Sequence, residues 1–131
     1  MHKLHILFVD SDPITHGCMQ QVLGKDYILH SVHSVAEAKE FLHLFSSDML
    51  ISEVVLASGS GLELCTYVRS TPALDAMPVM FLTSCATLND KVAGFQAGAD
   101  DYIVKPFDTL HLVARIRLLA RIKRLEQHIR I

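Results

Sequence analysis

The sequence predicts a doubly wound α/β fold, with a five-stranded parallel sheet and five helices of which the last is extended. Two observations carry this prediction. Short apolar runs alternate five times with segments of helical spacing, which is the pattern of parallel strands joined by helices. The chain has 131 residues, and half of them are apolar, which suits one domain with a substantial core.

The first unit is a strand at residues 4–9 followed by a helix from Pro13 to Leu23. Asp12 suits the N-cap of this helix, Pro13 suits its first position, and Gly24 ends it. The apolar residues that recur along the helix at every fourth position are expected to face the core. They are Ile14, Cys18 and Val22.

The next two units follow the same order. A strand at 27–32 has the polar alternation of an edge strand, and Ser34 caps the helix after it. A buried strand at 49–52 precedes a helix at 62–68. The apolar stripe of the helix that Ser34 caps is expected at Val35, Ala38, Leu42 and Phe45.

The last two strands are expected at 78–83 and 102–104. The first of them is apolar almost throughout, as a central parallel strand is. The helix between them reaches about Ala97, and Gly98 ends it. From about Thr109 a long helix is expected to run to the end of the chain.

Composition argues against several classes of function. The net charge of −2 does not favour a binder that holds nucleic acid by charge. The three cysteines lack metal-ligand spacing, and the eight histidines form no pair with a third ligand nearby. No apolar run approaches the roughly 20 residues of a membrane helix. Without a signal peptide, the cysteines indicate reduced thiols in a cytoplasmic protein.

Polar side chains follow four of the five predicted strands. The carboxyl ends of parallel strands meet at one edge of the sheet, where ligands bind. Carboxylates hold a hard cation, a lysine neutralises phosphate charge, and a hydroxyl donates a hydrogen bond. The sequence therefore predicts a phosphoryl or metal–phosphate site. Its candidate residues are Asp10, Ser11 and Asp12, then Glu53, then Thr83 and Ser84, and finally Lys105.

Four segments together resemble the receiver domain of two-component response regulators, over residues 4 to about 122. They read ILFVDSDP, DMLISEVVLASGSGLEL, PVMFLTS and GADDYIVKPF. The resemblance implies the flavodoxin-like strand order 2-1-3-4-5 and a signalling module rather than an enzyme. It also implies that residues 1–122 form the receiver domain and that 123–131 extend its last helix.

The resemblance also implies roles for individual residues. In that family a histidine kinase phosphorylates an aspartate at the position of Glu53, and an aromatic side chain at the position of Tyr102 turns inward when the site is occupied. Thr83 and Tyr102 would then form the switch, and Pro106 would follow a cis peptide bond. The implied neighbours of the phosphate are Thr83, Ser84 and Lys105.

The implied Mg²⁺ ligands are Asp10, the residue at position 11 and the backbone carbonyl of Val55. The sequence departs from the family at Ser11, where a metal-ligating acid belongs, and at Glu53. Ala57 also replaces a loop proline. A neutral serine is a poor ligand for Mg²⁺, which demands near-ideal octahedral geometry, so we expect Mg²⁺ binding to be weakened or lost.

Glutamate is longer than aspartate by on the order of 1.5 Å, a shift large enough to spoil in-line attack on a phosphodonor. We therefore predict a degenerate receiver that is not phosphorylated at Glu53, with Glu53 paired to Lys105. The alternative is a working receiver that is phosphorylated at Glu53 or at another residue with Mg²⁺. A small flavodoxin-like enzyme is a third hypothesis, but the acidic segment after the first strand would repel its phosphate.

Several residues keep a plain structural interpretation beside the functional one. Asp12 could be only an N-cap, and Asp10 could either touch a cation or hydrogen-bond Lys105. Tyr102 could be an ordinary half-buried strand aromatic. Asp100 and Asp101 are interpreted as solvated surface.

The last helix is basic and carries an apolar seam at Leu118, Ile122, Leu125 and Ile129. By resemblance, residues 123–131 would link the receiver to an output domain such as a diguanylate cyclase or a histidine kinase, or the segment could fray into solvent. Residues 88–119, with the C-terminal helix, would supply a homodimer surface or meet other signalling proteins. Contact of this helix with nucleic acid is a weaker alternative, because its basic residues lie on several faces.

Overall fold

The computed structural model describes residues 3–129, with side chains described as far as Ile122. One parallel sheet has the predicted strand order β2-β1-β3-β4-β5. Its strands are β1 (His5–Val9), β2 (Ile28–Val32), β3 (Met49–Ser52), β4 (Val79–Thr83) and β5 (Asp101–Val104). The helices are α1 (Pro13–Leu23), α2 (Val35–Leu44), α3 (Gly61–Ser70), α4 (Leu88–Gln96) and α5 (Thr109–Ile129).

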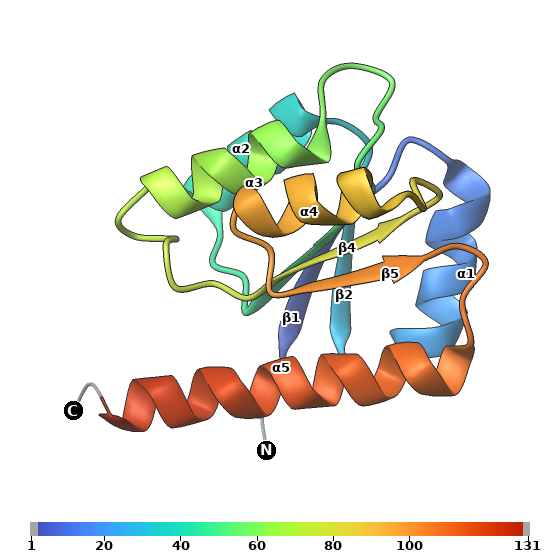
Figure 1. Cartoon of the computed structure of the whole chain (residues 1–131). Helices are drawn as coiled ribbons and strands as arrows, with labels where there is room; N and C mark the ends of the chain where they lie inside the picture. Colours follow the sequence, from blue (N-terminus) through green and yellow to red (C-terminus); the bar gives the residue numbers. More distant parts are fainter. Residues whose placement is uncertain (1–2, 130–131) are drawn as a thin grey trace.

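The sheet is covered on both faces (Figure 1), with α1 and α5 on one side and α2, α3 and α4 on the other. Successive residues of a strand point to opposite faces. In β1, Ile6 and Phe8 therefore enter the core under α1 and α5, whereas Leu7 and Val9 enter the core under α2 and α3. Burial on both faces explains why the inner strands are nearly continuous apolar runs.

The parallel register brings the carboxyl ends of four strands together. Val9 lies opposite Ser52, and Thr83 lies opposite Val104. The amide of Glu53 donates to the carbonyl of Val9 at 2.9 Å. The residues that follow β1, β3, β4 and β5 therefore meet at one edge of the sheet, as expected for this fold.

Helix α1 begins where predicted, but its expected apolar stripe is wrong at Ile14 and Cys18, whereas Val22 is half-buried and packs against the core as expected. Asp12 caps the helix and accepts from the amide of Ile14. Ile14 and Cys18 are exposed, and the residues buried from α1 are His16, Met19 and Leu23.

The reason is that a polar side chain takes a core-facing position on α1. The ring of His16 packs edge-on against Phe8, and its Nε2 donates to the carbonyl of Asp10 at 2.6 Å. A histidine whose N–H has an acceptor can be buried, although Nδ1 of His16 has no hydrogen-bond partner among the described residues. A pattern made from apolar residues alone therefore selects the wrong face of the helix.

Replacing Ile14 with serine tests this corrected orientation. Because 77% of Ile14 is exposed, Ile14→Ser should change the free energy of unfolding by less than about 0.5 kcal/mol. Chemical denaturation of both proteins measures the difference. A loss of about 2 kcal/mol or more, typical of a buried aliphatic side chain, would return Ile14 to the core.

Three further expectations need correction. The stripe of α2 holds for Val35, Ala38 and Leu42, but Phe45 is the C-cap and 59% exposed. Asp101 is buried rather than solvated, and it accepts from Arg115 at 2.6 Å.

Asp100 is exposed but not merely solvated, since it accepts from Arg69 and from the amide of Val79. Both acids thus hold the ends of β4 and β5 in place.

Helix α5 is continuous across position 122, where the receiver domain was expected to end. Leu118 and Ile122 are exposed, at 36% and 42%. The side chains of Leu125 and Ile129, the rest of the expected seam, lie outside the described residues. Across the described residues, the helices are all too short or too polar to span a bilayer.

Candidate functional site

Lys105 joins two buried carboxylates at the carboxyl edge of the sheet. Its Nζ donates to Asp10 Oδ2 at 2.7 Å and to Glu53 Oε2 at 2.9 Å. Asp10 is 3% exposed and Glu53 is 5% exposed. The lysine follows β5, and the Lys105–Pro106 peptide bond is cis. One cation thus neutralises much of the charge of two acids that reach it from β1 and β3.

The site favours the protonated, positively charged form of Lys105. Burial lowers its pKa, but hydrogen bonds to Asp10 and Glu53 and their negative charges outweigh burial, so the pKa lies above its ordinary value. The stabilisation linked to this shift is fully present below the ordinary pKa of 10.5. It is lost as the pH rises through the raised value.

Every oxygen of the Glu53 carboxylate has a donor. Oε1 accepts from the amides of Val54 at 2.9 Å and Val55 at 3.3 Å. The hydroxyl of Thr83 donates to the same oxygen, while Oε2 accepts from Lys105. The carboxylate of Glu53 therefore occupies the space between Lys105, Thr83 and the two backbone amides.

Ser11 ties three loops together through its hydroxyl. The hydroxyl donates to the carbonyl of His33 at 3.2 Å and accepts from the amide of Ala57 at 2.8 Å. These contacts link the ends of β1 and β2 to the loop after β3. In this arrangement Ser11 serves the geometry of the loops.

The two acids that follow β1 are also engaged. Asp10 Oδ1 accepts from the amide of Asp12 at 2.9 Å. Asp12 itself caps α1 and accepts from Thr15 at 3.2 Å. Val55 forms an isolated bridge with Ser60, in which the amide of Gly61 donates to the carbonyl of Val54 at 2.8 Å, so the carbonyl of Val55 itself accepts no hydrogen bond from the described residues. Within the described part of the chain, no three His, Cys, Asp or Glu side chains are grouped so that they could hold a metal ion.

A chain of hydrogen bonds leads from Glu53 to Tyr102. Thr83, which donates to Glu53, accepts from the amide of Cys85 at 3.1 Å. The carbonyl of Cys85 in turn accepts from the hydroxyl of Tyr102 at 2.8 Å. Ser84, expected beside the phosphate, is exposed and makes no side-chain hydrogen bond to the described residues.

The ring of Tyr102 lies over α4 and β4. It packs against Phe81 and Phe95, with ring centroids 6.0 and 6.3 Å apart. Burial raises the pKa of Tyr102 to about 12, with smaller contributions from Cys85, Asp90 and Glu53. Tyr102 is therefore a neutral hydrogen-bond donor at neutral pH.

Gly94 gives the Tyr102 ring its room. A Cβ at this position would lie 2.8 Å from Tyr102 Cδ2 and 2.9 Å from Cε2. We expect Gly94→Ala to displace the ring, break its bond to Cys85, and lower the free energy of unfolding by about 1–2 kcal/mol. NMR of the tyrosine ring and chemical denaturation measure both effects, and an unmoved ring would contradict the placement.

Sequence reasoning missed Cys85 and His16. Cys85 acts through its backbone amide and carbonyl, and every residue type except proline carries both groups, so the sequence does not reveal this role. His16 supports the Asp10 carbonyl from α1. Its place at the fourth position of a capped helix that follows the acidic segment could have indicated this contact.

Comparison with known proteins agrees with this geometry. The sequence model of the protein family described as the response regulator receiver domain matches residues 6–117 of this chain. The response regulator MprA of Mycobacterium ulcerans is 36% identical over 125 residues, which cover 95% of this chain and 53% of that protein. The transcriptional regulatory protein YvrH of Bacillus subtilis is 37% identical over 130 residues, covering 97% and 52%. The chain thus spans about half the length of the curated relatives it matches.

A solved structure gives the same result. The signal receiver domain of a signal transduction histidine kinase from Syntrophus aciditrophicus has a TM-score of 0.84 and 30% identity, and the match covers 90% of each chain. The family model matches residues 6–117, and this range includes all five strands, the acids that follow β1 and β3, and the lysine that follows β5. The chain therefore belongs to the response regulator receiver domain family.

Proposed function

We propose that this receiver domain of two-component signalling is not phosphorylated at Glu53 and regulates through protein contacts. The single observation that carries the proposal is the closed arrangement of Glu53. Both of its oxygens are engaged, with Lys105, Thr83 and two backbone amides as donors. In this state the domain has no enzymatic activity of its own.

The arrangement of Glu53 opposes transfer of a phosphoryl group. A nucleophilic carboxylate needs a free oxygen in line with the leaving group, and a misplacement of about 1 Å can cost a hundredfold in rate. Glu53 Oε1 accepts three hydrogen bonds and Oε2 accepts a charged one. Attack would have to break contacts that neutralise a buried charge.

The cation site of the family does not fit the residues of this chain. Mg²⁺ prefers carboxylates and keeps near-ideal octahedral geometry. Here Asp10 has both oxygens engaged and Asp12 caps α1, while Ser11 uses its hydroxyl to hold the loops after β2 and β3. We propose that these contacts weaken or remove Mg²⁺ binding, and that the ammonium of Lys105 supplies the positive charge instead.

Contacts with other proteins would carry the signal. Exposed apolar side chains lie on α4 and α5 within residues 88–119, on either side of the edge strand β5, and they suit self-association or a signalling partner. They are Leu88, Val92, Phe95, Leu110 and Leu118. Because the matched relatives are about twice as long, we propose that α5 and residues 123–131 continue into an output domain.

Phosphoryl transfer to the whole chain tests the proposal. The native protein and a Ser11→Asp/Glu53→Asp variant are incubated with Mg²⁺ and acetyl phosphate and compared by intact mass. We expect the native protein to stay unmodified and the variant to gain one phosphoryl group. Glu53→Asp alone separates the acceptor from the cation ligand. A phosphoryl group on the native protein, at Glu53 or elsewhere, would contradict the proposal.

A further inference from the structure

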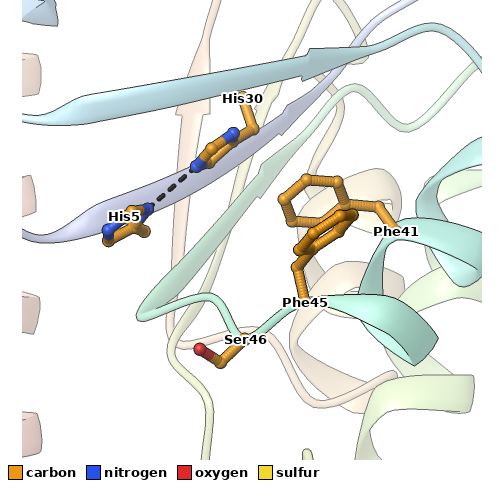
Figure 2. A pocket seen from close by; sticks show the side chains of 5 residues that line it. All are labelled: His5, His30, Phe41, Phe45 and Ser46. Carbon is orange, nitrogen blue, oxygen red and sulfur yellow. Dashed lines mark hydrogen bonds between the residues drawn. The ribbon is translucent and has the colours of Figure 1, made fainter.

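A hollow of about 270 Å³ lies between the neighbouring strands β1 and β2 and the end of α2. It is far along the sheet from Glu53, because His5 begins β1 while Asp10 follows its other end. Its lining, shown in Figure 2, consists of His5, His30, Phe41, Phe45 and Ser46. None of these side chains carries a fixed charge.

The two histidines form a nearly planar pair. His5 Nδ1 and His30 Nε2 are 2.9 Å apart, the ring centroids are 5.1 Å apart, and the ring planes differ by 7°. Because the facing nitrogens are so much closer than the ring centres, the rings meet edge to edge rather than face to face. An imidazole N–H and lone pair lie in the ring plane, so this is a well-directed N–H···N hydrogen bond.

When both rings are neutral, this pair offers a ligand one lone pair and one N–H. Each neutral imidazole has one N–H and one acceptor nitrogen. Whichever ring donates across the pair, one outer nitrogen is an N–H and the other is an acceptor. The outer nitrogens of His5 and His30 have no partner among the described residues. Burial, with a smaller effect of His5, lowers the pKa of His30, which favours the neutral form of this ring near pH 7.

The opposite wall is aromatic. Phe41 lies 4.9 Å from the His30 ring and 5.1 Å from the Phe45 ring, measured between centroids. Phe45 is 59% exposed, so a ligand in the hollow would cover it. Helix α2 also ends here, and the carbonyls of a helix C-terminus carry partial negative charge. Although the pair also presents one N–H, the negatively polarised ring faces and the helix end disfavour an anion. They favour a neutral ligand that donates to the acceptor nitrogen.

We propose that this hollow is a binding site for a small, planar, neutral aromatic molecule that carries an N–H donor. The volume is just below the range of about 300–1,000 Å³ for drug-sized ligands, so one ring or two fused rings fit. The ring packs against Phe41 and Phe45, and the N–H donates to the free lone pair of the His5–His30 pair. The site is independent of the chemistry at Glu53.

Amide NMR of the whole chain, titrated with indole, tests the site. Indole has two fused rings and one N–H donor. Saturable shifts are expected around His5, His30 and Phe45, with a dissociation constant on the order of 1 mM for so small a ligand. Benzofuran has the same shape with oxygen in place of N–H, and it should bind about tenfold more weakly because it lacks the hydrogen bond.

Two variants and one control complete the test. Phe45→Ala should weaken the binding of indole at least severalfold. The fold should stay intact, because the side chain of Phe45 is largely exposed. His30→Phe should remove the difference between indole and benzofuran. His43 lies near the end of α2 but outside the lining of the hollow. His43→Ala should therefore change neither the affinity for indole nor the difference between indole and benzofuran. Absence of saturable shifts, equal binding of indole and benzofuran, or unchanged binding in Phe45→Ala would each overturn the proposal.

Discussion

Replacing Lys105 with methionine is expected to lower the free energy of unfolding by about 4 kcal/mol at pH 7.5, because removing one partner of a buried ion pair costs about 3–5 kcal/mol. Asp10 and Glu53 would face each other as buried carboxylates without their shared cation. Methionine keeps most of the volume of the side chain, so the loss is electrostatic. Urea denaturation measures it.

The pH dependence of the same variant identifies the cause. Protonation of one carboxyl group removes the repulsion, so the deficit of Lys105→Met relative to the native protein should shrink between pH 7.5 and about pH 4.5. Lys91→Met is the matched control, because Lys91 is exposed on α4, and it should change stability by less than about 0.5 kcal/mol. A deficit that is independent of pH would mean that packing, rather than charge, is lost.

Replacing Gly61 with alanine is the second substitution with a large expected effect, a loss of about 3 kcal/mol. A Cβ at Gly61 would lie 2.2 Å from the carbonyl oxygen of Glu53 and 3.0 Å from Phe81. The nearer atom belongs to the backbone and cannot rotate away. Helix α3 would have to move from the end of β3, which would also disturb the contacts of Glu53.

Gly17 provides the matched control for this effect. It lies in α1 and is exposed, and a Cβ added there would meet no atom within 4 Å. Gly17→Ala should therefore stabilise the protein by about 0.5–1 kcal/mol, because alanine loses less backbone entropy in a helix. Thermal or chemical denaturation compares the two variants. Equal effects of the two substitutions would refute the close approach at Gly61.

The fold followed from signals that lie in the sequence itself. The apolar runs and the Asp12 and Ser34 caps predicted the alternation of strands and helices, and the resemblance to receiver domains implied the strand order, and the structure confirms both. The polar residues after the strands indicated the edge of the sheet at which to look for a site. The parallel register then places the residues after the strands next to one another, since parallel strands bring their carboxyl ends together. Of the candidate site residues, Asp10, Glu53, Thr83 and Lys105 meet there.

What the sequence did not reveal depends on partners distant in the chain. The burial of Asp101 requires Arg115 on α5, and the bonds of Ser11 require His33 and Ala57. Such contacts arise only when elements pack. The orientation of α1 was missed because His16 becomes acceptable in the core only after it reaches the Asp10 carbonyl.

The proposal that Glu53 closes its own site is tested most directly by amide NMR of the native chain, first with Mg²⁺ and then with beryllofluoride, beside the Ser11→Asp/Glu53→Asp variant. We expect no shifts around Glu53, Thr83 and Lys105 in the native protein and clear shifts in the variant. That result would mean an intact receiver scaffold in which two substitutions removed the chemistry. Saturable shifts in the native protein would contradict the closed site and show that it still accepts a phosphoryl analogue.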